Sequence, residues 1–370
     1  MWNYNNPVKI IFGENKFNDI YKIIDNKKYI VLSSKNIFEK YSKKLMSLQN
    51  PPLKVIKNIN PNPDYSELLS LIDDFSNLSK DVDLILAIGG GSVIDSAKTL
   101  AAFKNDKKLL TDFVRGAKKP KIIKPIDIIA VPTTSGSSSE LTCWATIWDK
   151  ELCNKLSLSH PYLYPKIALI DPVITLDKPQ SLTVSTGLDI LSHSMESIWN
   201  INANPISANH AIIAAKIVIK NLPKLAKDLK NIELRKNLSL ACVHAGLAFS
   251  NTKTAISHNI SYPITLKYGV QHGVACSFTL PVVMRSMQGI NQVAEKRLEA
   301  IFNNDLEKSS LQLHKMLQSL QIPLNLTELK IHKKDMDQII EDAFEGERGK
   351  NFLGNINSFK KSCEEMEILK

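Results

Sequence analysis

Apolar residues in the first half of the chain form short runs that alternate with stretches of helical spacing. This alternation is typical of a parallel sheet whose strands are connected by helices that cover it. The runs that we interpret as strands are residues 8–13, 28–34, 53–59, 83–89, 127–132 and 166–171. The pattern therefore predicts an α/β domain with a parallel sheet over residues 1–180.

The pattern changes after residue 180, where the strand signal fades. Long amphipathic stretches follow, of which residues 205–229 and 234–251 are the clearest. Their apolar positions recur at the spacing of a helix. Residues 181–370 are therefore predicted to form a second, all-helical domain, and a chain of 370 residues is long enough for two domains.

Consecutive glycines, Gly89, Gly90 and Gly91, separate one predicted strand from a helix that should begin near Ser92. A backbone without side chains turns tightly and approaches a ligand closely. The free N–H groups and the positive dipole end of the helix favour an anion such as a pyrophosphate. The segment is not the GxGxxG dinucleotide motif. A tight turn without a ligand is the alternative, but so many glycines exceed what a turn requires, and we favour phosphate binding.

A second loop, PTTSGSSSE, follows the predicted strand at residues 127–132. Its hydroxyl side chains include Thr133, Thr134, Ser137, Ser138 and Ser139. Such hydroxyls hydrogen-bond phosphate, ribose or amide groups, or they form local turns and a helix cap with Glu140. Ligands of open α/β sheets lie at the carboxyl ends of the strands, so the position of this loop favours cofactor binding.

An aspartate and a histidine, Asp189 and His193, lie four residues apart in the helix-like segment TGLDILSHSMES. On a helix this spacing places both side chains on one face, where an oxygen and a nitrogen can converge on a metal ion. A hydrogen-bonded Asp–His pair is the alternative for these two residues alone. His258 and His272 complete a set of three nitrogens and one oxygen, which suits Fe(II) or Zn(II).

Composition excludes several classes of protein. Apolar residues make up 44% and charged residues 23% of the chain, as in an ordinary globular protein. No apolar run approaches the roughly 18 residues that cross a bilayer, and the N-terminal segment lacks the features of a signal peptide. We therefore expect a cytoplasmic protein without a membrane partner. The five cysteines lie far apart without a CxxC pair, which argues against a disulfide framework and against a thiolate zinc site.

The formal net charge is +10, but the lysines are spread along the chain without interleaved aromatic residues. Nucleic-acid binding is therefore disfavoured, and a solvated lysine-rich surface is expected. The positive charge would also attract small anionic substrates.

Taken in order, several segments resemble the iron-containing (group III) alcohol dehydrogenase family: GGGSVIDSAK, PTTSGSSSE, LIDP, TGLDILSHSMES and SHNISYPITLKYGVQHG. The resemblance covers nearly the whole chain. It implies a Rossmann-like α/β N-terminal domain and an all-α C-terminal domain, the architecture shared with dehydroquinate synthase and glycerol dehydrogenase. It also implies a homodimer that uses Fe(II) or Zn(II) and NAD(H) or NADP(H) to interconvert an aldehyde and an alcohol.

The resemblance assigns roles by position. The metal ligands of the family are matched by Asp189, His193, His258 and His272. The pyrophosphate and ribose loop is matched by Gly89, Gly90, Gly91, Ser92 and Asp95, and the second cofactor loop by Thr133, Thr134 and Ser137. Segments that flank the nicotinamide in relatives contain Lys155 and Leu176. In such enzymes the metal polarises the substrate carbonyl while hydride moves from the nicotinamide.

Two positions depart from the usual family pattern. Tyr262 stands where many members carry a histidine, and its phenol either hydrogen-bonds or relays a proton, or it only lines the pocket. Ser34 and Lys35 stand where NAD-preferring members carry an aspartate. Without that carboxylate, repulsion of a 2′-phosphate is absent and NADP(H) is permitted. The choice between the two cofactors stays open.

Residues 257–281 most resemble the phosphonoacetaldehyde reductases of the family, which make 2-hydroxyethylphosphonate. A phosphonate needs cationic partners, and we expect Arg348 to be one, with a solvated loop arginine as the alternative. Lys350 and Arg285 are further cations in suitable segments. A general dehydrogenase for short alcohols, diols or lactaldehyde is the close alternative. A dehydroquinate-synthase-like lyase is a remote one, because the Asp/His/His/His set argues against it.

Overall fold

The computed structural model describes residues 1–78, 80–116, 124–151 and 154–366. They form two compact units. The sheet unit comprises Pro7–Thr134 and Ser138–Thr175, and the helical unit comprises Met1–Asn6, Ser135–Ser137 and the chain from Leu176 onward. Each unit has its own hydrophobic core. The functional boundary predicted between residues 180 and 181 stays a prediction.

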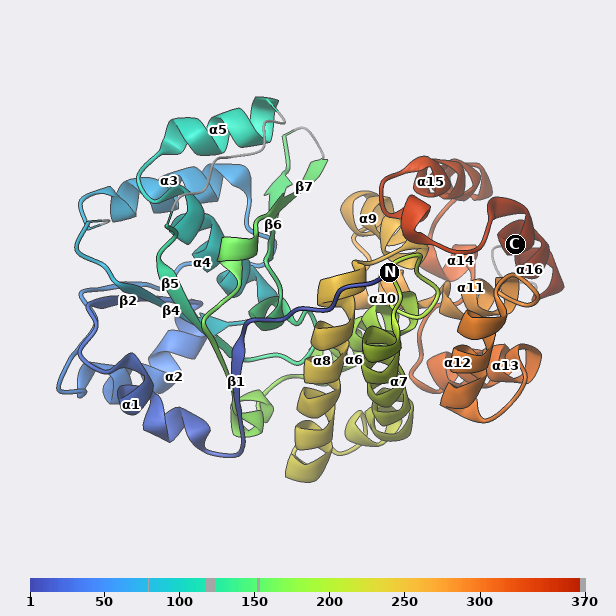
Figure 1. Cartoon of the computed structure of the whole chain (residues 1–370), viewed down its shortest axis with the longest axis horizontal. Coiled ribbons are helices and arrows are strands. Elements are labelled where there is room, and N and C mark those ends of the chain that lie inside the picture. The colour runs from blue at the N-terminus through green and yellow to red at the C-terminus, as the bar shows by residue number, and fades with distance from the viewer. Residues whose placement is uncertain (79, 117–123, 152–153, 367–370) are drawn as a thin grey trace. The chain divides into compact units, whose positions relative to one another are not determined.

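Parallel strands form the centre of the sheet unit, in the order β1-β8-β5-β4-β2-β3 (Figure 1). They are β1 (Lys9–Phe12), β2 (Tyr29–Ser33), β3 (Lys54–Ile56), β4 (Leu84–Gly89), β5 (Asp127–Pro132) and β8 (Ile167–Ile170). Each strand lies within one of the predicted runs, so the predicted parallel sheet is confirmed.

Helices cover both faces of this sheet, with α1 and α2 on one face and α3, α4 and α5 on the other (Figure 1). They are α1 (Ile20–Ile24), α2 (Lys35–Met46), α3 (Tyr65–Ser76), α4 (Gly91–Phe103) and α5 (Lys107–Gly116). Ile85 of β4 enters the core shared with α3 to α5, whereas Leu84 and Leu86 enter the core shared with α1 and α2. A strand buried on both faces reads as a continuous apolar run, which is why these strands are visible in the sequence.

An antiparallel ribbon of two strands, β6 (Trp144–Asp149) and β7 (Asn154–Ser159), lies outside the predicted elements. The sequence analysis placed no strand between residues 132 and 166, and this is corrected here. Ala145 and Leu158 point into the core of the sheet unit, whereas the alternate positions Thr146 and Ser157 are polar. Trp144 and Trp148 share the second face with Thr146, so β6 shows neither a clean alternation nor the continuous run of apolar β-branched residues of the central strands.

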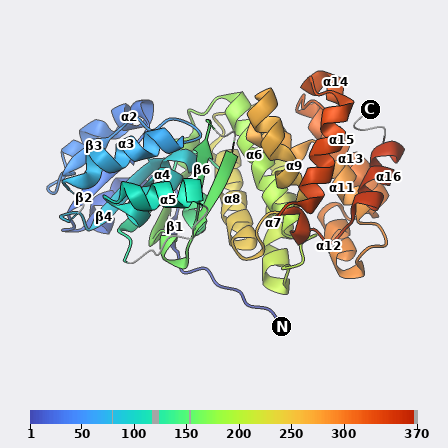
Figure 2. The same cartoon turned by 90° about the horizontal axis from the view of Figure 1, so that it is seen from above.

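The described elements after Leu176 are helical, which confirms the predicted all-helical second half (Figure 2). The α-helices are α6 (Gln180–Glu196), α7 (Pro205–Leu225), α8 (Ile232–Thr252), α9 (Ile256–Tyr268), α10 (His272–Ser277), α11 (Leu280–Ser286), α12 (Gln292–Phe302), α13 (Leu306–Ser319), α14 (Leu326–Leu329), α15 (Lys333–Glu345) and α16 (Ile356–Glu365). Short 3₁₀ helices are η1 (Lys16–Asp19), η2 (Ser139–Leu141), η3 (Pro161–Leu163), η4 (Pro172–Thr175) and η5 (Gly349–Asn351). Helix α7 begins with a capping box in which Asn204 and Ser207 satisfy each other's backbone N–H groups.

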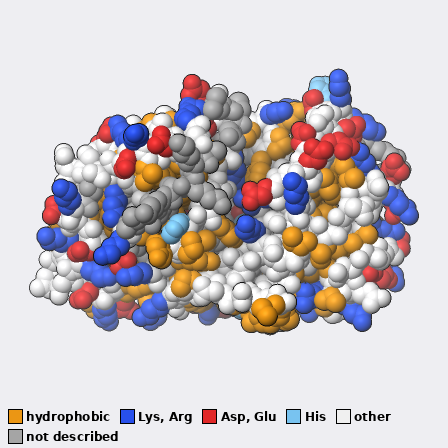
Figure 3. All heavy atoms as spheres, turned by 45° about the horizontal axis from the view of Figure 1, so that its top comes forward, with side chains coloured by type: hydrophobic (Ala, Val, Ile, Leu, Met, Phe, Trp, Pro, Cys, Tyr) orange, Lys and Arg blue, Asp and Glu red, His pale blue; other side chains and the backbone are white. Residues whose placement is uncertain are grey.

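Lysine and arginine side chains are spread among acidic and uncharged side chains on the face shown in Figure 3, which is the distribution of a solvated surface. In the part of the chain that the structure describes, no helix is long and apolar enough to cross a membrane. The described cysteines are free thiols: Cys143, Cys242, Cys276 and Cys363. Cys153 lies outside the described residues.

Helix α10 packs closely against α6 at Gly273. A Cβ atom on Gly273 would lie 1.8 Å from the backbone oxygen of Ser185, so only glycine permits this approach. The approach places His272, the first residue of α10, beside the helix that carries Asp189 and His193.

We expect Gly273→Ala to lower the free energy of unfolding by about 1–3 kcal/mol, because α10 has to move away from α6 to admit the new methyl group. Gly269→Asn is a matched control, since Gly269 has a φ of +68° with open space around its Cβ position, and asparagine tolerates this conformation. Urea denaturation of both variants and of the parent chain measures the difference. Equal losses in the two variants would contradict the close-packing argument.

Candidate metal centre and cofactor loops

Helix α6 carries Asp189 and His193 on one face, as their four-residue spacing predicts. Both are buried, with 6% and 5% of their surface exposed. His193 Nε2 lies 3.7 Å from Asp189 Oδ1, which is beyond hydrogen-bonding distance. The simple hydrogen-bonded pair that the sequence also allowed is therefore not formed.

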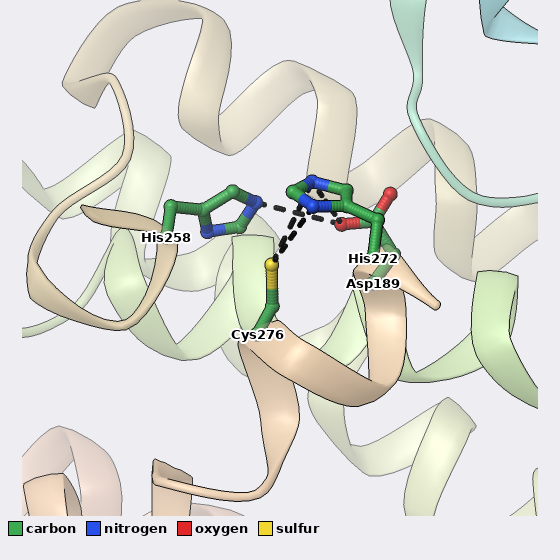
Figure 4. A group of neighbouring side chains, drawn as sticks. All are labelled: Asp189, His258, His272 and Cys276. Carbon is green, nitrogen blue, oxygen red and sulfur yellow. Dashed lines mark hydrogen bonds and ion pairs between the residues drawn. The ribbon is translucent and has the colours of Figure 1, made fainter. Parts of the chain in front are cut away.

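Two further imidazoles, His258 of α9 and His272 of α10, reach the same carboxylate oxygen (Figure 4). Their Nε2 atoms lie 3.5 Å and 4.0 Å from Asp189 Oδ1. In tetrahedral coordination with bonds of about 2.0–2.2 Å, donor atoms lie roughly 3.4 Å apart. The structure thus brings the predicted ligands together around one oxygen, at separations close to those of a coordination sphere.

Several buried atoms of this group have no hydrogen-bond partner within the described part of the chain: Asp189 Oδ1, His193 Nδ1 and His258 Nε2. Buried polar atoms are normally paired, because an unpaired one loses its hydration without compensation. A divalent cation would be the missing partner of the Asp189 oxygen and the His258 nitrogen. Imidazole nitrogen with carboxylate oxygen suits Fe(II) or Zn(II), so the residues present fit a metal ion.

Glu196, at the end of α6, fixes the orientation of His258. Its Oε2 accepts a hydrogen bond from His258 Nδ1 at 2.5 Å, and its Oε1 accepts bonds from the backbone N–H groups of Ser257 and His258. A carboxylate on the far nitrogen of an imidazole selects the tautomer that leaves Nε2 free for a metal. The sequence analysis missed Glu196, although it lies three residues after His193, a spacing that shares a helix face.

Stacking fixes the ring of His193. The ring lies nearly parallel to that of Phe249, with centroids 4.0 Å apart and an angle of 6°. The His193 ring also stacks on the ring of His258, with centroids 4.6 Å apart and an angle of 21° between the ring planes. These ring contacts hold His193 without using its Nδ1 atom, which has no hydrogen-bond partner among the described residues.

Local electrostatics keep Asp189 ionised and His193 neutral, which are the protonation states that bind a metal. Burial alone would raise the pKa of Asp189, but the neighbouring imidazoles, His193 first, hold that pKa below its usual value and keep the carboxyl ionised. Burial lowers the pKa of His193 to about 4, so its ring is neutral at pH 7. For His258, burial opposes the charge, but Cys276 and Glu196 raise the pKa well above its usual value. An ion that binds His258 therefore has to displace a proton.

His272 is the accessible member of the group. Its side chain is 34% exposed, against 9% or less for the other predicted ligands. Tyr262 stacks on it, with ring centroids 6.1 Å apart and an angle of 9°. The guanidinium carbon of Arg348 lies 5.5 Å from the Tyr262 ring centroid, and Arg348 donates a hydrogen bond to Thr254 Oγ1. A cation thus stands close to the exposed side of the centre.

The other candidate cations have different surroundings. Arg285 pairs with Glu307 at 3.2 Å and with Glu365 at 3.3 Å, so its charge is balanced within the protein. Lys350 is exposed in the same loop as Arg348. Of these cations, Arg348 is the one that the structure places beside Tyr262 and the centre.

The glycine loop joins β4 to α4 as predicted. Gly89 ends the strand, Gly90 occupies the N-cap position, and the helix begins at Gly91. The Ser92 hydroxyl accepts a hydrogen bond from the backbone N–H of Asn62 at 3.0 Å. The N-cap residue Gly90 has no side chain to cap α4, and the positive end of the helix dipole is suited to an anion such as a phosphate.

The hydroxyl loop lies beside the glycine loop, because β5 pairs with β4. The backbone N–H of Thr133 donates to the Gly89 oxygen at 2.9 Å. A Cβ atom on Gly90 would lie 3.2 Å from Thr134 Oγ1, so these two loops approach closely. Ser137 belongs to the helical unit.

Asp95 and Lys98 connect α4 to the end of the hydroxyl loop and to the segment that follows it. The Asp95 carboxylate accepts bonds from Ser139 Oγ at 2.6 Å and from the Thr146 N–H at 2.9 Å. Lys98 is fully buried, and its Nζ donates to the backbone oxygens of Ser139 at 2.6 Å and Trp144 at 2.7 Å. Burial lowers the pKa of Lys98 to about 8, and the Asp95 charge opposes that shift. The sequence analysis missed Lys98, which lies three residues after Asp95 on α4.

The remaining predicted cofactor residues lie on separate elements. Ser34 is half-buried at the N-cap position of α2, directly after β2. Lys155 lies in β7, with its Nζ 5.3 Å from the Trp148 ring centroid. Leu176 follows η4 and begins the long segment of the helical unit. Their contacts with a cofactor stay predictions.

Known proteins similar to this chain include several oxidoreductases. It is 28% identical to the NAD-dependent methanol dehydrogenase of Bacillus methanolicus over 302 residues. This alignment covers 79% of this chain and 78% of the relative. It is 33% identical to the phosphonoacetaldehyde reductase of Streptomyces viridochromogenes over 208 residues. This alignment covers 55% of this chain and 53% of the relative. The crystal structure of a sulfoacetaldehyde reductase from Bifidobacterium kashiwanohense in complex with NAD⁺ superposes with a TM-score of 0.90 at 26% identity, covering 100% of this chain and 98% of that chain.

Family models match most of the sequence. Residues 7–172 match the model described as "Iron-containing alcohol dehydrogenase", and residues 183–363 match "Fe-containing alcohol dehydrogenase family, C-terminal". The architecture of a parallel sheet followed by helices agrees with that of the similar solved structure. The chain therefore belongs to the iron-containing alcohol dehydrogenase family, and it is an oxidoreductase of that family.

Proposed function

We propose that this chain reduces a short aldehyde that carries an anionic group, with phosphonoacetaldehyde as the leading substrate and 2-hydroxyethylphosphonate as the product. Bound NADH or NADPH would supply the hydride for the carbonyl carbon, and a proton from solvent would complete the alcohol. The observation that carries the proposal is the place of Arg348, which lies over Tyr262 beside the partly exposed residue His272. We further expect a homodimer, as the family resemblance implies, and a cytoplasmic location.

Four side chains are proposed to hold Fe(II) or Zn(II): Asp189, His193, His258 and His272. The bound ion would supply a Lewis acid for the aldehyde oxygen. Glu196 keeps His258 in the tautomer that presents Nε2 to the ion. The low exposure of Asp189, His193 and His258 excludes water from most of the centre, so a substrate has access on the side of His272. Tyr262 lines that side, where its phenol is a hydrogen-bond donor for the substrate or a wall of its site.

The sheet unit is proposed to hold the nicotinamide cofactor. The uncapped start of α4 after Gly90 suits the pyrophosphate, and the neighbouring hydroxyls of Thr133 and Thr134 suit phosphate or ribose. The hydrogen bonds of Asp95 and Lys98 fix the segment next to these loops before the cofactor arrives. This preorganisation lowers the entropy that binding has to overcome.

Charge on the substrate is the feature that Arg348 would recognise. A guanidinium binds a phosphonate or sulfonate through parallel N–H donors, which a neutral aldehyde cannot exploit. Two of the similar proteins are named as reductases of phosphonoacetaldehyde and of sulfoacetaldehyde, aldehydes that each carry an acid group. We place the phosphonate first because the local identity is higher, 33% against 26%.

A dehydrogenase for uncharged short alcohols, diols or lactaldehyde is the second candidate. It is favoured by the similarity to a methanol dehydrogenase, which extends over 79% of this chain. Under this alternative Arg348 would only hold its loop to Thr254.

Replacement of Arg348 separates these two functions. We expect Arg348→Ala to lower kcat/KM for phosphonoacetaldehyde by about 10–100-fold, because a hydrogen bond to a charged group contributes about 1.5–3 kcal/mol. The value for propanal should change by less than about threefold. Sulfoacetaldehyde in the same steady-state assay tests the choice between the two acids, and Arg348→Lys should restore part of the loss.

Lys350→Ala removes an exposed cation from the same loop and should leave both aldehydes unaffected. An equal effect of Arg348→Ala on phosphonoacetaldehyde and propanal would assign Arg348 to loop structure and favour the second candidate.

Replacement of Glu196 tests the metal centre. In Glu196→Gln the amide oxygen can still accept the backbone bonds, but the amide nitrogen faces His258 Nδ1 and favours the tautomer with hydrogen on Nε2. We expect zinc affinity to fall about 10–100-fold, as for other residues that orient a metal ligand. Competition with a chelating dye measures it. Glu233→Gln, an exposed change in the first turn of α8, is the control, and the same affinity in both variants would count against the assigned role.

Replacement of Ser34 tests the cofactor site. We expect the parent chain to oxidise both NADH and NADPH, and Ser34→Asp to lower kcat/KM for NADPH by about tenfold or more, because the new carboxylate repels a 2′-phosphate. The value for NADH should be kept or should rise. Ser47→Asp adds the same charge at the other end of α2 and should change neither value. Loss of both activities together in Ser34→Asp would argue against this position as the ribose end of the site.

A further inference from the structure

A cysteine thiol lies among the donor atoms of the centre. Cys276 Sγ is 3.6 Å from His272 Nε2 and 3.7 Å from His272 Nδ1. One donor atom each from Asp189, His258, His272 and Cys276 can be chosen so that all lie within 4.8 Å of one another. Figure 4 shows the sulfur pointing toward the imidazoles from the helix that carries His272.

The position of Cys276 follows from local structure. His272 and Cys276 are four residues apart on α10, so their side chains share a face of that helix. Gly273 holds the first turn of α10 tightly against α6, which keeps the thiol beside Asp189. The Cys276 side chain is fully buried and has no disulfide partner among the described cysteines.

The distance between Cys276 Sγ and His272 Nε2 matches that of two ligands on one metal ion. With a zinc–sulfur bond of about 2.3 Å and a zinc–nitrogen bond of about 2.0–2.1 Å, tetrahedral coordination places sulfur and nitrogen roughly 3.6 Å apart. The observed separation from His272 Nε2 is 3.6 Å. The sulfur and Nε2 are therefore close enough to bind one ion. Because the sulfur is almost equally close to Nδ1, the partly exposed His272 ring has to turn so that Nε2 faces the same ion.

A second buried thiol shows what an ordinary packing cysteine looks like in this chain. Cys242 of α8 belongs to the hydrophobic core of the helical unit, among leucine, isoleucine and alanine side chains. Cys276 does not belong to that core cluster, and its neighbours at the centre are imidazoles and a carboxylate. Apolar packing alone thus accounts for Cys242 and leaves the surroundings of Cys276 unexplained.

We infer that Cys276 is a further ligand of the metal, so that a thiolate sulfur joins Asp189 and the imidazoles in its coordination. The inference rests on the metal centre proposed above. On binding, the thiol proton passes to solvent and a sulfur–metal bond replaces the sulfur–hydrogen bond. Two anionic ligands then balance the charge of a divalent ion, and the soft sulfur donor favours zinc over magnesium or manganese. The sequence analysis, which found no CxxC pair, did not anticipate a thiolate ligand.

The test uses the full chain, stripped of metal and reconstituted with cobalt(II) or zinc(II). We expect the cobalt form to show a near-ultraviolet sulfur-to-cobalt charge-transfer band that is absent from Cys276→Ser and Cys276→Ala and retained in Cys242→Ala. X-ray absorption of the zinc form should show a sulfur neighbour at about 2.3 Å in the parent chain. Zinc affinity of Cys276→Ala should fall about tenfold or more, since even residues that only orient a ligand contribute that much.

Each outcome has one meaning. A parent chain that binds zinc with nitrogen and oxygen neighbours only would overturn the inference while leaving the metal centre in place, and this holds even if the variants fail to fold. A parent chain that binds no metal would overturn the proposed centre itself. Substrate assays decide separately whether the proposed aldehyde is correct, because neither spectrum depends on turnover.

Discussion

Burial of a carboxylate oxygen without a hydrogen-bond partner is the constraint on which the helical unit depends. Asp189 Oδ1 lies inside the protein with the imidazoles of His193, His258 and His272 at 3.5–4.0 Å, and it has no hydrogen-bond partner among the described residues. A buried carboxylate is unfavourable, and the imidazoles that face it from beyond hydrogen-bonding distance reduce that cost only in part. A cation at this point would pair the oxygen and the nitrogens together. The proposed metal would therefore contribute to the stability of the helical unit as well as to its chemistry.

The donor atoms are held by contacts that do not involve a metal. Glu196 caps the start of α9 and fixes the ring of His258, while Phe249 supports the ring of His193. Gly273 sets the distance between α10 and α6. Because these contacts form without an ion, they preorganise His193, His258 and α10 for the proposed metal. The same rigidity places Cys276 beside the imidazoles.

The sheet unit also contains a buried ionisable group, Lys98, which interacts electrostatically with Asp95. Lys98 is fully buried, which is unfavourable for a lysine, and it recovers the lost hydration through bonds to Ser139, Thr142 and Trp144 and through the charge of Asp95. These bonds fix the segment that follows the hydroxyl loop against α4. Both units thus use a buried ionisable group to position the elements that are proposed to bind cofactor and metal.

The sequence by itself determined the elements and the local geometry. Apolar periodicity located the six parallel strands and the long helices, because burial imposes a repeat that is visible in neighbouring residues. The spacing of Asp189 and His193 placed both on one helix face. Residue chemistry grouped His258 and His272 with these two as candidate ligands, and the family resemblance assigned all four by position, since His258 and His272 lie far along the chain from α6.

Only the tertiary structure decided which residues distant in sequence contact one another. Glu196 bonds to His258 across 62 positions of sequence, and Lys98 bonds to Trp144 across 46. The ribbon of β6 and β7 and the approach of Arg348 to Tyr262 likewise depend on which surfaces pack together. Hydrophobic periodicity carries information about a residue and its near neighbours, whereas these contacts depend on how elements distant in sequence pack. That is why the sequence predicted which residues could bind a metal, and the packing decided which of them share one point.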